Sequence, residues 1–213
     1  MNKALKKWII RKVGKNIVYL RLPPVSRILS DRILNREYRK LQPGKVLFVG
    51  AGYKWYYKTK IPHAEFLTVD IDDTHQPDIL SDVHDLQIAD EQFDVVVMTR
   101  VLEHLPDPRK AISEVRRVLK PGGTAIFSAP FIHKYHASPR DYWRFTHEGL
   151  AELCRDFADC RVLPYGNRLH VIWQFLSQGM ILRWILKPLC HPISWLHFRT
   201  KDFPLGHVVV ARK

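Results

Sequence analysis

Cysteine is scarce in this chain of 213 residues, which contains Cys154, Cys160 and Cys190 alone. An odd number without paired spacing fits neither a disulfide framework nor a zinc site, so we expect reduced thiols and no metal ion. A reducing, cytoplasmic compartment is the expectation that follows. The length suits one domain, because a chain of this size has too few residues for two complete ones.

Long apolar runs are also missing. The longest, Leu169 to Leu182, falls short of the roughly 20 residues that a membrane-spanning helix needs. A short apolar cluster at Trp8 is interrupted at once by Arg11 and Lys12, unlike a secretory signal. We therefore expect a protein that does not cross a membrane.

Acidic residues are almost absent from the two ends, and the net charge is +13. Residues 1–30 hold eight lysines or arginines and no acid, and residues 161–213 hold eight against the single Asp202. Residues 31–160, with 18 basic and 20 acidic residues, are near neutral. The ends therefore indicate an anionic partner, either a membrane surface or nucleic acid, unless they form a solvated basic surface.

The middle of the chain alternates β-branched runs with helical or turn segments, as parallel sheets do. Strands are predicted at residues 45–50, 65–71, 93–99, 124–129, 160–164 and 207–211, with a weaker one at 77–80. Helices are predicted at residues 107–119, where a Pro-Gly-Gly stop follows, and at 148–157. Residues 1–42 are expected to form a basic helical N-terminal arm, divided by Pro23-Pro24, and residues 43–213 the α/β domain.

An apolar and basic insertion at about 166–206 precedes the last predicted strand and has no place in a minimal sheet. At helical spacing, His170, Gln174, Ser177 and Gln178 share one side, and Ile172, Phe175, Leu176 and Ile185 form an apolar arc. Such an arc either packs in the core or enters the lipid headgroup region.

The sharpest motif is Val46 to Lys54, in which a buried strand runs directly into Gly50-Ala51-Gly52. Glycine lets the backbone turn tightly and approach a ligand, and the N–H groups that follow can bind it. About 20 residues later a second strand ends at Asp70, where a carboxylate can accept two ribose hydroxyls. The pair predicts a nucleotide site.

The order of motifs over residues 44–130 resembles class I S-adenosylmethionine-dependent methyltransferases, of the type 11-like group. The stretch from Phe93 to Gly123 is similar to the family's fourth strand, the helix after it and the turn into the fifth strand. The resemblance implies an α/β, doubly wound, mostly parallel seven-stranded Rossmann-like sheet with the last strand reversed. It also implies S-adenosylmethionine as cofactor and transfer of its methyl group.

The same resemblance assigns a cofactor site. The glycine turn would hold the amino acid part, Asp70 the ribose and Asp82 the adenine. The implied positions are Gly50, Ala51, Gly52, Asp70, Ile71, Asp82, Val83, Arg100 and His104. Two residues depart from the family pattern, because Phe48 replaces a usual acid and Lys54 a common third glycine. A non-catalytic partner protein with this fold is the alternative that these departures suggest.

The segment from Ala129 to Leu150 is unusually rich in His, Arg, Tyr, Trp and Asp. Its DYWRFT pattern resembles methyltransferases that are similar to bacterial cell-surface glycan enzymes, which implies a glycan or lipid-linked saccharide hydroxyl as acceptor. Such a hydroxyl must lose a proton, for which imidazole is suited near neutral pH. The predicted catalytic residues are His133, His136 and Asp141, with His104 as a further candidate base and a structural hydrogen bond as each histidine's alternative role.

Other acceptors and functions stay open. RNA fits the basic ends, but neither end interleaves aromatic residues with a basic stripe. A quinone-like small molecule is a further candidate acceptor. A nicotinamide dehydrogenase would share the glycine turn, but the third glycine of its fingerprint is absent. The favoured expectation is O-methylation of a glycan or lipid-linked acceptor, with the enzyme peripheral on the cytoplasmic membrane face.

Overall fold

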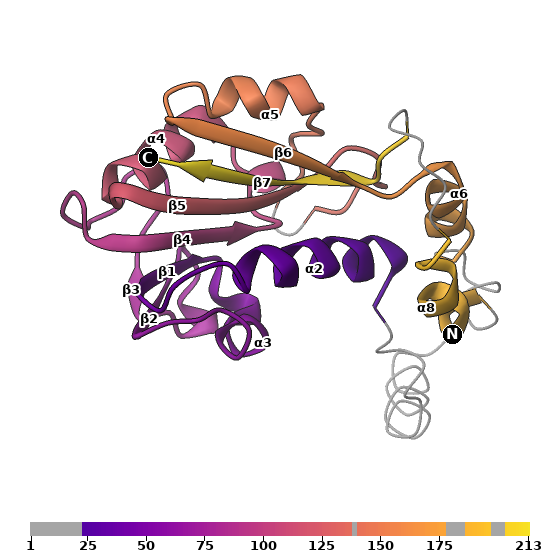
Figure 1. The fold of residues 1–213 in the computed structure, drawn as a ribbon, viewed down its shortest axis with the longest axis horizontal. Helices are drawn as coiled ribbons and strands as arrows, with labels where there is room; N and C mark the ends of the chain where they lie inside the picture. Colours follow the sequence, from indigo (N-terminus) through magenta and orange to yellow (C-terminus); the bar gives the residue numbers. More distant parts are fainter. Residues whose placement is uncertain (1–22, 138–139, 178–185, 197–202) are drawn as a thin grey trace, which may run out of the picture.

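A single seven-stranded sheet forms the centre of the protein (Figure 1). The computed structural model describes residues 23–137, 140–177, 186–196 and 203–213. The strands are β1 (Lys45–Val49), β2 (Glu65–Asp70), β3 (Ile79–Leu80), β4 (Phe93–Thr99), β5 (Leu119–Pro130), β6 (Asp159–Tyr165) and β7 (Gly206–Arg212). Their order is β3-β2-β1-β4-β5-β7-β6. Strands β1 to β5 pair in parallel and β7 is antiparallel to both neighbours, which confirms the predicted fold class.

Helices cover both faces of the sheet. On one face α4 (Pro108–Val118) and α5 (His147–Leu153) lie over β4, β5 and β7, and on the other lie α2 (Val25–Tyr38) and the short α3 (Lys54–Lys58) (Figure 1). The first core contains the apolar face of α4, and the second contains the apolar residues of α2. The two cores hold the sheet between helical layers. The edge formed by the carboxyl ends of the parallel strands is then available for a ligand-binding site.

Helix α4 begins as predicted but ends earlier than its sequence suggests. The Asp107 side chain caps it by accepting from the N–H of Lys110 at 3.0 Å. The predicted helix ran to Leu119 and was stopped by Pro121-Gly122-Gly123. In the structure Leu119 already pairs with Phe93 of β4, so the Pro-Gly-Gly segment lies within β5, at an irregularity of that pairing. Sheet pairing therefore ends the helix before the glycines do.

Helix α2 begins immediately after Pro23-Pro24 and packs on the sheet through Val25, Leu29 and Leu34. It is the second of the two helices predicted for the N-terminal arm. Residues 1–22, which hold the first, lie outside the described residues. The described part of the arm is thus a layer of the domain, and α2 contacts β6 and β7 as well as the insertion.

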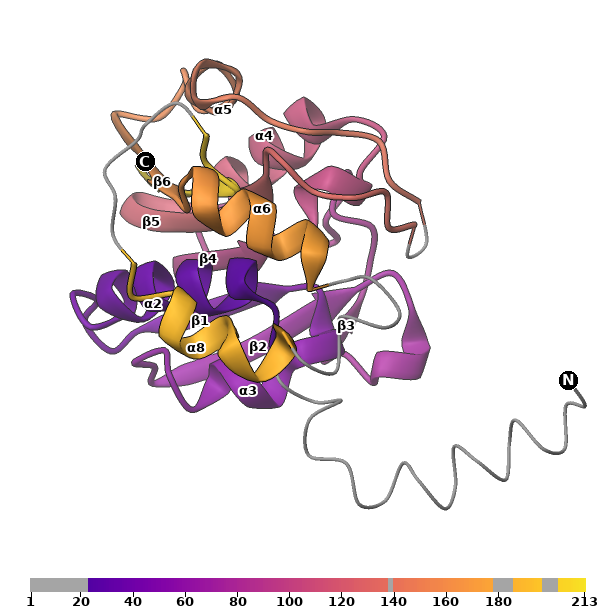
Figure 2. The same cartoon turned by 90° about the vertical axis from the view of Figure 1, so that its right-hand side faces the viewer.

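The insertion forms α6 (Arg168–Leu176) and the short η5 (Lys187–Leu189) and α8 (Cys190–Ile193). Figure 1 shows α6 and α8 at the end of the sheet toward which β4 points, and Figure 2 looks onto that edge with both helices in front. Polar contacts hold them there, since Arg32 of α2 donates to the Ser194 carbonyl and hydroxyl at 3.0 Å. The insertion therefore borders the ligand edge of the sheet.

Helix α6 presents its polar side to the protein. His170, Gln174 and Ser177 are buried, whereas Ile172 is 51% and Phe175 is 46% exposed. The apolar arc predicted for this segment is therefore not part of the core over the described residues. None of the helices that the structure describes combines the length and apolar character that crossing a bilayer requires.

Candidate active site

The glycine turn lies where β1 ends and the 3-10 helix η2 (Ala51–Tyr53) begins. Gly50 has a φ of 89°, which favours glycine, and a Cβ there would lie 2.9 Å from Cγ2 of Val101. Strand β2 braces the turn, because Gly50 N–H donates to the Val69 carbonyl and Ala51 N–H donates to Oδ2 of Asp70 at 2.7 Å. The turn is thus a preformed backbone cradle beside a carboxylate.

Asp70 retains capacity for a ligand. Its Oδ1 accepts from the N–H of Asp72 at 3.1 Å, and a carboxylate has about four lone-pair sites, so two remain for the hydroxyls of a ribose. Ile71 is exposed beside it. A Cβ on Gly52 would lie 3.5 Å from the ring of His75, in ordinary contact, so this second glycine is less constrained than Gly50. A tight backbone turn next to a free carboxylate edge fits S-adenosylmethionine.

Asp82 and Val83 follow β3 and lie in its loop. Oδ1 of Asp82 accepts from the backbone N–H of His84 at 2.9 Å and lies 2.6 Å from its Nδ1. Partial burial raises the pKa of Asp82, but the hydrogen bonds from His84 outweigh it and hold the pKa below its usual value. The loop is therefore ordered around an ionised carboxylate, with Val83 buried in the core beneath it.

Two cationic side chains near the turn have other partners. The Arg100 guanidinium donates to Tyr57 Oη at 2.9 Å and lies 3.2 Å from Asp31 of α2, so it links the end of β4 to the N-terminal helix. The Lys54 ammonium donates to the carbonyl of Gln76. The contacts of Arg100 with Tyr57 and Asp31 give no support to a contact between Arg100 and the cofactor. The cofactor contact of Arg100 stays a prediction.

Phe48 belongs to the aromatic packing under the turn. Its ring lies 5.1 Å from that of Tyr57 and 5.9 Å from that of Phe66, both in stacked orientation. An acid at this position would face the apolar core between β1 and α3. The aromatic neighbours of Phe48 therefore suit a phenylalanine at the position where the family usually has an acid.

The loop after β5 brings the predicted catalytic residues together. The ring centroids of His133 and His136 lie 4.5 Å apart, and Nδ1 of His136 lies 3.4 Å from Oδ2 of Asp141. Arg144 holds Asp141 through two contacts, of 2.5 Å and 2.7 Å, and His136 N–H donates to the same carboxylate at 2.8 Å. The sequence-predicted residues thus form one contiguous group.

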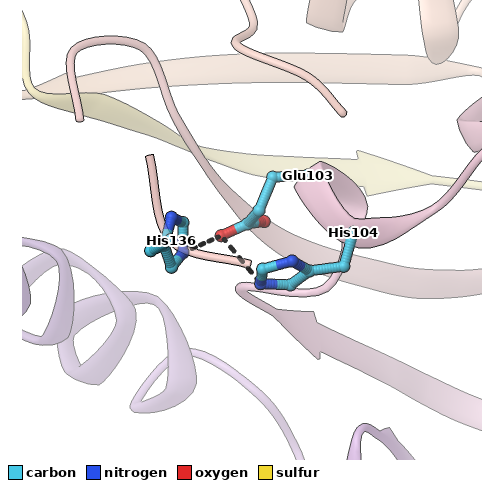
Figure 3. A group of neighbouring side chains, drawn as sticks. All are labelled: Glu103, His104 and His136. Carbon is cyan, nitrogen blue, oxygen red and sulfur yellow. Dashed lines mark ion pairs between the residues drawn. The ribbon is translucent and has the colours of Figure 1, made fainter. Parts of the chain in front are cut away.

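A second segment completes this group from the end of β4. Glu103 and His104 lie in the 3-10 helix η4 (Leu102–His104), and the ring centroids of His104 and His136 are 5.0 Å apart (Figure 3). The loop is tied to this segment, because the N–H groups of Tyr142 and Trp143 donate to the Glu103 carbonyl. His104, predicted both as a cofactor contact and as a further candidate base, lies among the candidate catalytic residues, and its cofactor contact stays a prediction.

Burial changes the proton affinity of these groups in opposite directions. Desolvation lowers the pKa of His133 and of His136, and both rings are therefore neutral at pH 7. The same effect raises the pKa of the Glu103 carboxyl. Hydrogen bonds from Arg144 hold the pKa of Asp141 far below its usual value. The site therefore presents unprotonated imidazoles next to a fixed anion.

The aromatic residues of this loop divide between packing and exposure. Phe145 is buried in the first core, whereas Tyr142 and Trp143 are partly exposed. The Trp143 indole N–H donates to the Leu105 carbonyl at 2.8 Å, so this ring fastens the loop to the segment after β4. Trp143 was predicted to pack in the core, but its ring is partly exposed and therefore packs only in part.

Glu103 and Arg144 are not among the residues that the sequence predicts for the site, although both lie within it. Arg144 is part of the DYWRFT pattern, and Glu103 immediately precedes His104. A carboxylate shortly after a largely apolar strand was the available signal for Glu103. The burial of Glu103, which makes its carboxylate important, depends on the loop around Tyr142, 39 residues further along the chain. The sequence alone does not show this contact.

Comparison with known proteins agrees with this geometry. Residues 53–127 match the family model described as "Methyltransferase domain". Over 94 residues the chain is 31% identical to a ubiquinone biosynthesis O-methyltransferase of Erwinia tasmaniensis, a match covering 44% of this chain and 33% of that protein. Matches to curated relatives span between 15% and 44% of those proteins' lengths.

Solved structures resemble most of the chain. A SAM-dependent methyltransferase from Archaeoglobus fulgidus aligns over 89% of this chain and 94% of its own, with a TM-score of 0.56 and 16% identity. Phosphoethanolamine N-methyltransferase 2 of Haemonchus contortus, solved with S-adenosyl-L-methionine, aligns over 84% of this chain and 52% of its own, with a TM-score of 0.55 and 18% identity. Residues 53–127 are thus similar to a methyltransferase domain, in a chain with the fold of the S-adenosylmethionine-dependent methyltransferases.

Proposed function

We propose that this chain binds S-adenosylmethionine at the glycine turn and transfers its methyl group to an acceptor. The main support is the bracing of the turn by Asp70, which holds the backbone N–H groups at the carboxyl edge of the sheet. Gly50 and Ala51 would hold the amino acid part, Asp70 the ribose hydroxyls, and Asp82 with Val83 the adenine. When bound, the cofactor supplies an electrophilic methyl group, and the protein supplies orientation.

Calorimetry tests the binding step directly. We expect S-adenosylmethionine to bind the full chain with one site, and Asp73→Ala, an exposed change three residues beyond Asp70, to bind alike. A folded protein that gives no binding heat would contradict the proposal. It would favour the alternative of a non-catalytic partner, for which Phe48 and Lys54 were the sequence signal.

For an acceptor hydroxyl, His133 is the better placed base of the two loop histidines. Its Nδ1–H donates to the Lys134 carbonyl at 2.9 Å, which leaves the lone pair of the neutral ring on Nε2. His136 instead directs Nε2 toward Glu103. We assign proton abstraction to His133, and positioning of the loop to Asp141 through His136 and Arg144.

The acceptor that we propose is a hydroxyl of a glycan or lipid-linked saccharide. Its support is the DYWRFT segment, whose Asp141 and Arg144 build the site. The Erwinia tasmaniensis relative is named for O-methylation in ubiquinone biosynthesis, so a quinone-like acceptor is the second candidate. Both chemistries present an oxygen nucleophile.

The exposed side of α6 supports attachment to an anionic membrane surface. Leu169, Ile172, Phe175 and Leu176 project away from the protein, and Trp195 and Leu196 are exposed after α8. Arg168 lies at the start of α6, and the terminal segments contribute further basic residues. An apolar arc flanked by cations is typical of interfacial helices. The ligand edge of the sheet would then face the lipid-linked acceptor.

A labelled-methyl assay distinguishes the acceptors. The full chain is incubated with labelled S-adenosylmethionine and, in separate arms, lipid-linked saccharides, quinone precursors or RNA. We expect label in the saccharide arm and its loss in His133→Ala. Label only in the quinone or RNA arm would overturn the saccharide assignment while supporting methyl transfer.

A further inference from the structure

Glu103, His104 and His136 converge on one point at the edge of the site. Oε1 of Glu103 lies 4.0 Å from Nε2 of His104 and 3.9 Å from Nε2 of His136 (Figure 3). The three potential ligand atoms all lie within 4.8 Å of one another. The residues come from two segments, η4 after β4 and the loop after β5, which the sheet places side by side.

These separations are too long for hydrogen bonds and suit a shared cation. A donor and acceptor in a hydrogen bond lie about 2.7–3.2 Å apart. Bonds of about 2.0–2.2 Å to a metal ion place two of its ligand atoms about 3–3.5 Å apart. The three atoms would have to move closer by about 0.5 Å or more to reach this spacing, through rotation of the imidazole rings and the carboxylate.

Both imidazoles place Nε2 toward Glu103. Nδ1–H of His104 donates to the Arg140 carbonyl, whereas Nδ1 of His136 lies 3.4 Å from Oδ2 of Asp141 without a hydrogen bond, and the backbone N–H of His136 donates to that carboxylate at 2.8 Å. A carbonyl or carboxylate on the other ring nitrogen is the usual support of a metal-binding histidine, because it sets the tautomer and the ring orientation. Arg144 in turn fixes Asp141, so the support extends one residue further.

The Glu103 carboxylate lacks the partners that a buried anion needs. Its side chain is 2% exposed, and its Oε2 is buried without a hydrogen-bond partner in the part of the chain that the structure describes. A buried carboxylate without partners is costly, and a cation bound at Oε1, the oxygen that faces both imidazoles, would offset part of its charge. His136 is 32% exposed, so the cluster opens to solvent on the side of the loop.

We propose that Glu103, His104 and His136 bind one divalent transition-metal ion, for which Zn²⁺ is the best match. One carboxylate and two imidazoles are a ligand set of catalytic zinc sites, which keep a further position open. Mg²⁺ and Ca²⁺ prefer oxygen ligands and fit this set less well. The open position would face the acceptor beside His133.

The role of this ion rests on the proposed function. An acceptor hydroxyl bound at the open position would lose its proton more readily, because the cation stabilises the alkoxide. The O–H bond breaks as Nε2 of His133 takes the proton. The oxygen then forms a bond to the methyl carbon, and the carbon–sulfur bond breaks with its electron pair remaining on sulfur.

Metal binding is tested on the full chain, without any acceptor. After chelator treatment and dialysis, Zn²⁺ is titrated, and Co²⁺ provides an absorption signal for the same site. We expect one ion per chain and an affinity at least tenfold lower in each of Glu103→Gln, His104→Ala and His136→Ala. The matched control is His191→Ala, an exposed histidine of α8, which should bind as the parent does.

Two outcomes would overturn the metal site. One is a folded parent protein that binds no Zn²⁺ or Co²⁺, and the other is equal affinity in His136→Ala and His191→Ala. His136→Ala keeps the test valid if Glu103→Gln fails to fold, since the His136 side chain is one-third exposed. Calorimetry with S-adenosylmethionine separates the hypotheses, because cofactor binding without metal overturns this inference alone, and metal binding without cofactor overturns only the proposed function.

Discussion

The two halves of the candidate active site are built in different ways. The cofactor half, at the ends of β1 and β2, consists of backbone N–H groups and Asp70, which braces them. The acceptor half, at the ends of β4 and β5, consists of side chains held by other side chains, as in the contacts of Arg144 with Asp141. The first depends on local turn geometry and the second on long-range packing.

This difference predicts different sensitivities. A backbone cradle tolerates changes in surrounding side chains, provided that the glycine and its brace remain. A side-chain cluster loses its geometry when one member is changed, because each group orients the next. Substitutions in the acceptor half should therefore lower turnover and leave cofactor binding intact, whereas substitutions in the cofactor half should weaken cofactor binding and lower turnover with it.

The largest effect is expected for His133→Ala in the acceptor half. Removing a general base typically lowers the rate about 100- to 10,000-fold. Turnover measured with labelled cofactor should fall by this factor, while the calorimetric affinity for S-adenosylmethionine stays the same. His63→Ala, a histidine before β2, is the control. A loss below tenfold would remove the base assignment from His133 and leave the loop a positioning role.

The next largest effect is expected for Asp70→Ala in the cofactor half. This change removes the brace of Ala51 and the acceptor of two ribose hydroxyls. Losing hydrogen bonds to a charged group costs about 1.5–3 kcal/mol, which is about a 10- to 150-fold weaker affinity. Calorimetry with the folded variant measures it, with Asp73→Ala as control. Unchanged affinity would mean that the cofactor binds elsewhere.

The cofactor half was largely predictable from the sequence. The strand that runs into Gly50-Ala51-Gly52 and the strand that ends at Asp70 are contiguous patterns, and the structure has both where they were expected. The seven-stranded, mostly parallel sheet with a reversed last strand, which the family resemblance implied, is confirmed. Local periodicity and glycine placement indicate the strands and the turn, so one sequence suffices to find those features.

The acceptor half was predictable only in part. The sequence identified His133, His136 and Asp141 from the composition of one loop, but not Glu103, which belongs to a segment about 30 residues earlier. No sign of the proposed metal ligands is visible in the sequence, because they come from two segments with no fixed spacing along the chain. Helix α4 ends before Leu119 because Leu119 pairs with Phe93 of β4. This contact joins segments far apart in the chain, so the local sequence pattern did not reveal it.

A smaller effect, confined to the acceptor half, is expected for Asp141→Asn. The change keeps the shape of the side chain but weakens its support of His136 and its pairing with Arg144. Loss of such supporting contacts typically lowers metal affinity 10- to 100-fold. Zn²⁺ titration should show this decrease, and calorimetry with S-adenosylmethionine should show none. A parallel decrease in both would mean that the two halves are coupled.

The smallest effect is expected where the acceptor half meets the proposed membrane. Ile172 on the outer side of α6 is half exposed, so Ile172→Ser should leave stability within about 0.5 kcal/mol of the parent. Losing its insertion into lipid costs about 1 kcal/mol, or about fivefold in partitioning to vesicles.

Cosedimentation with anionic and neutral vesicles, each at low and high salt, measures this difference. Leu80→Ser is the matched control, because Leu80 is an exposed apolar residue of β3, at the opposite end of the strand order from β6 (Figure 1). Each basic residue near an anionic bilayer contributes about 1 kcal/mol, so binding of the parent should weaken with salt and on neutral lipid. If the parent fails to bind either vesicle, the outer side of α6 serves another purpose. If Leu80→Ser weakens binding as much as Ile172→Ser, the attachment is not specific to the outer side of α6.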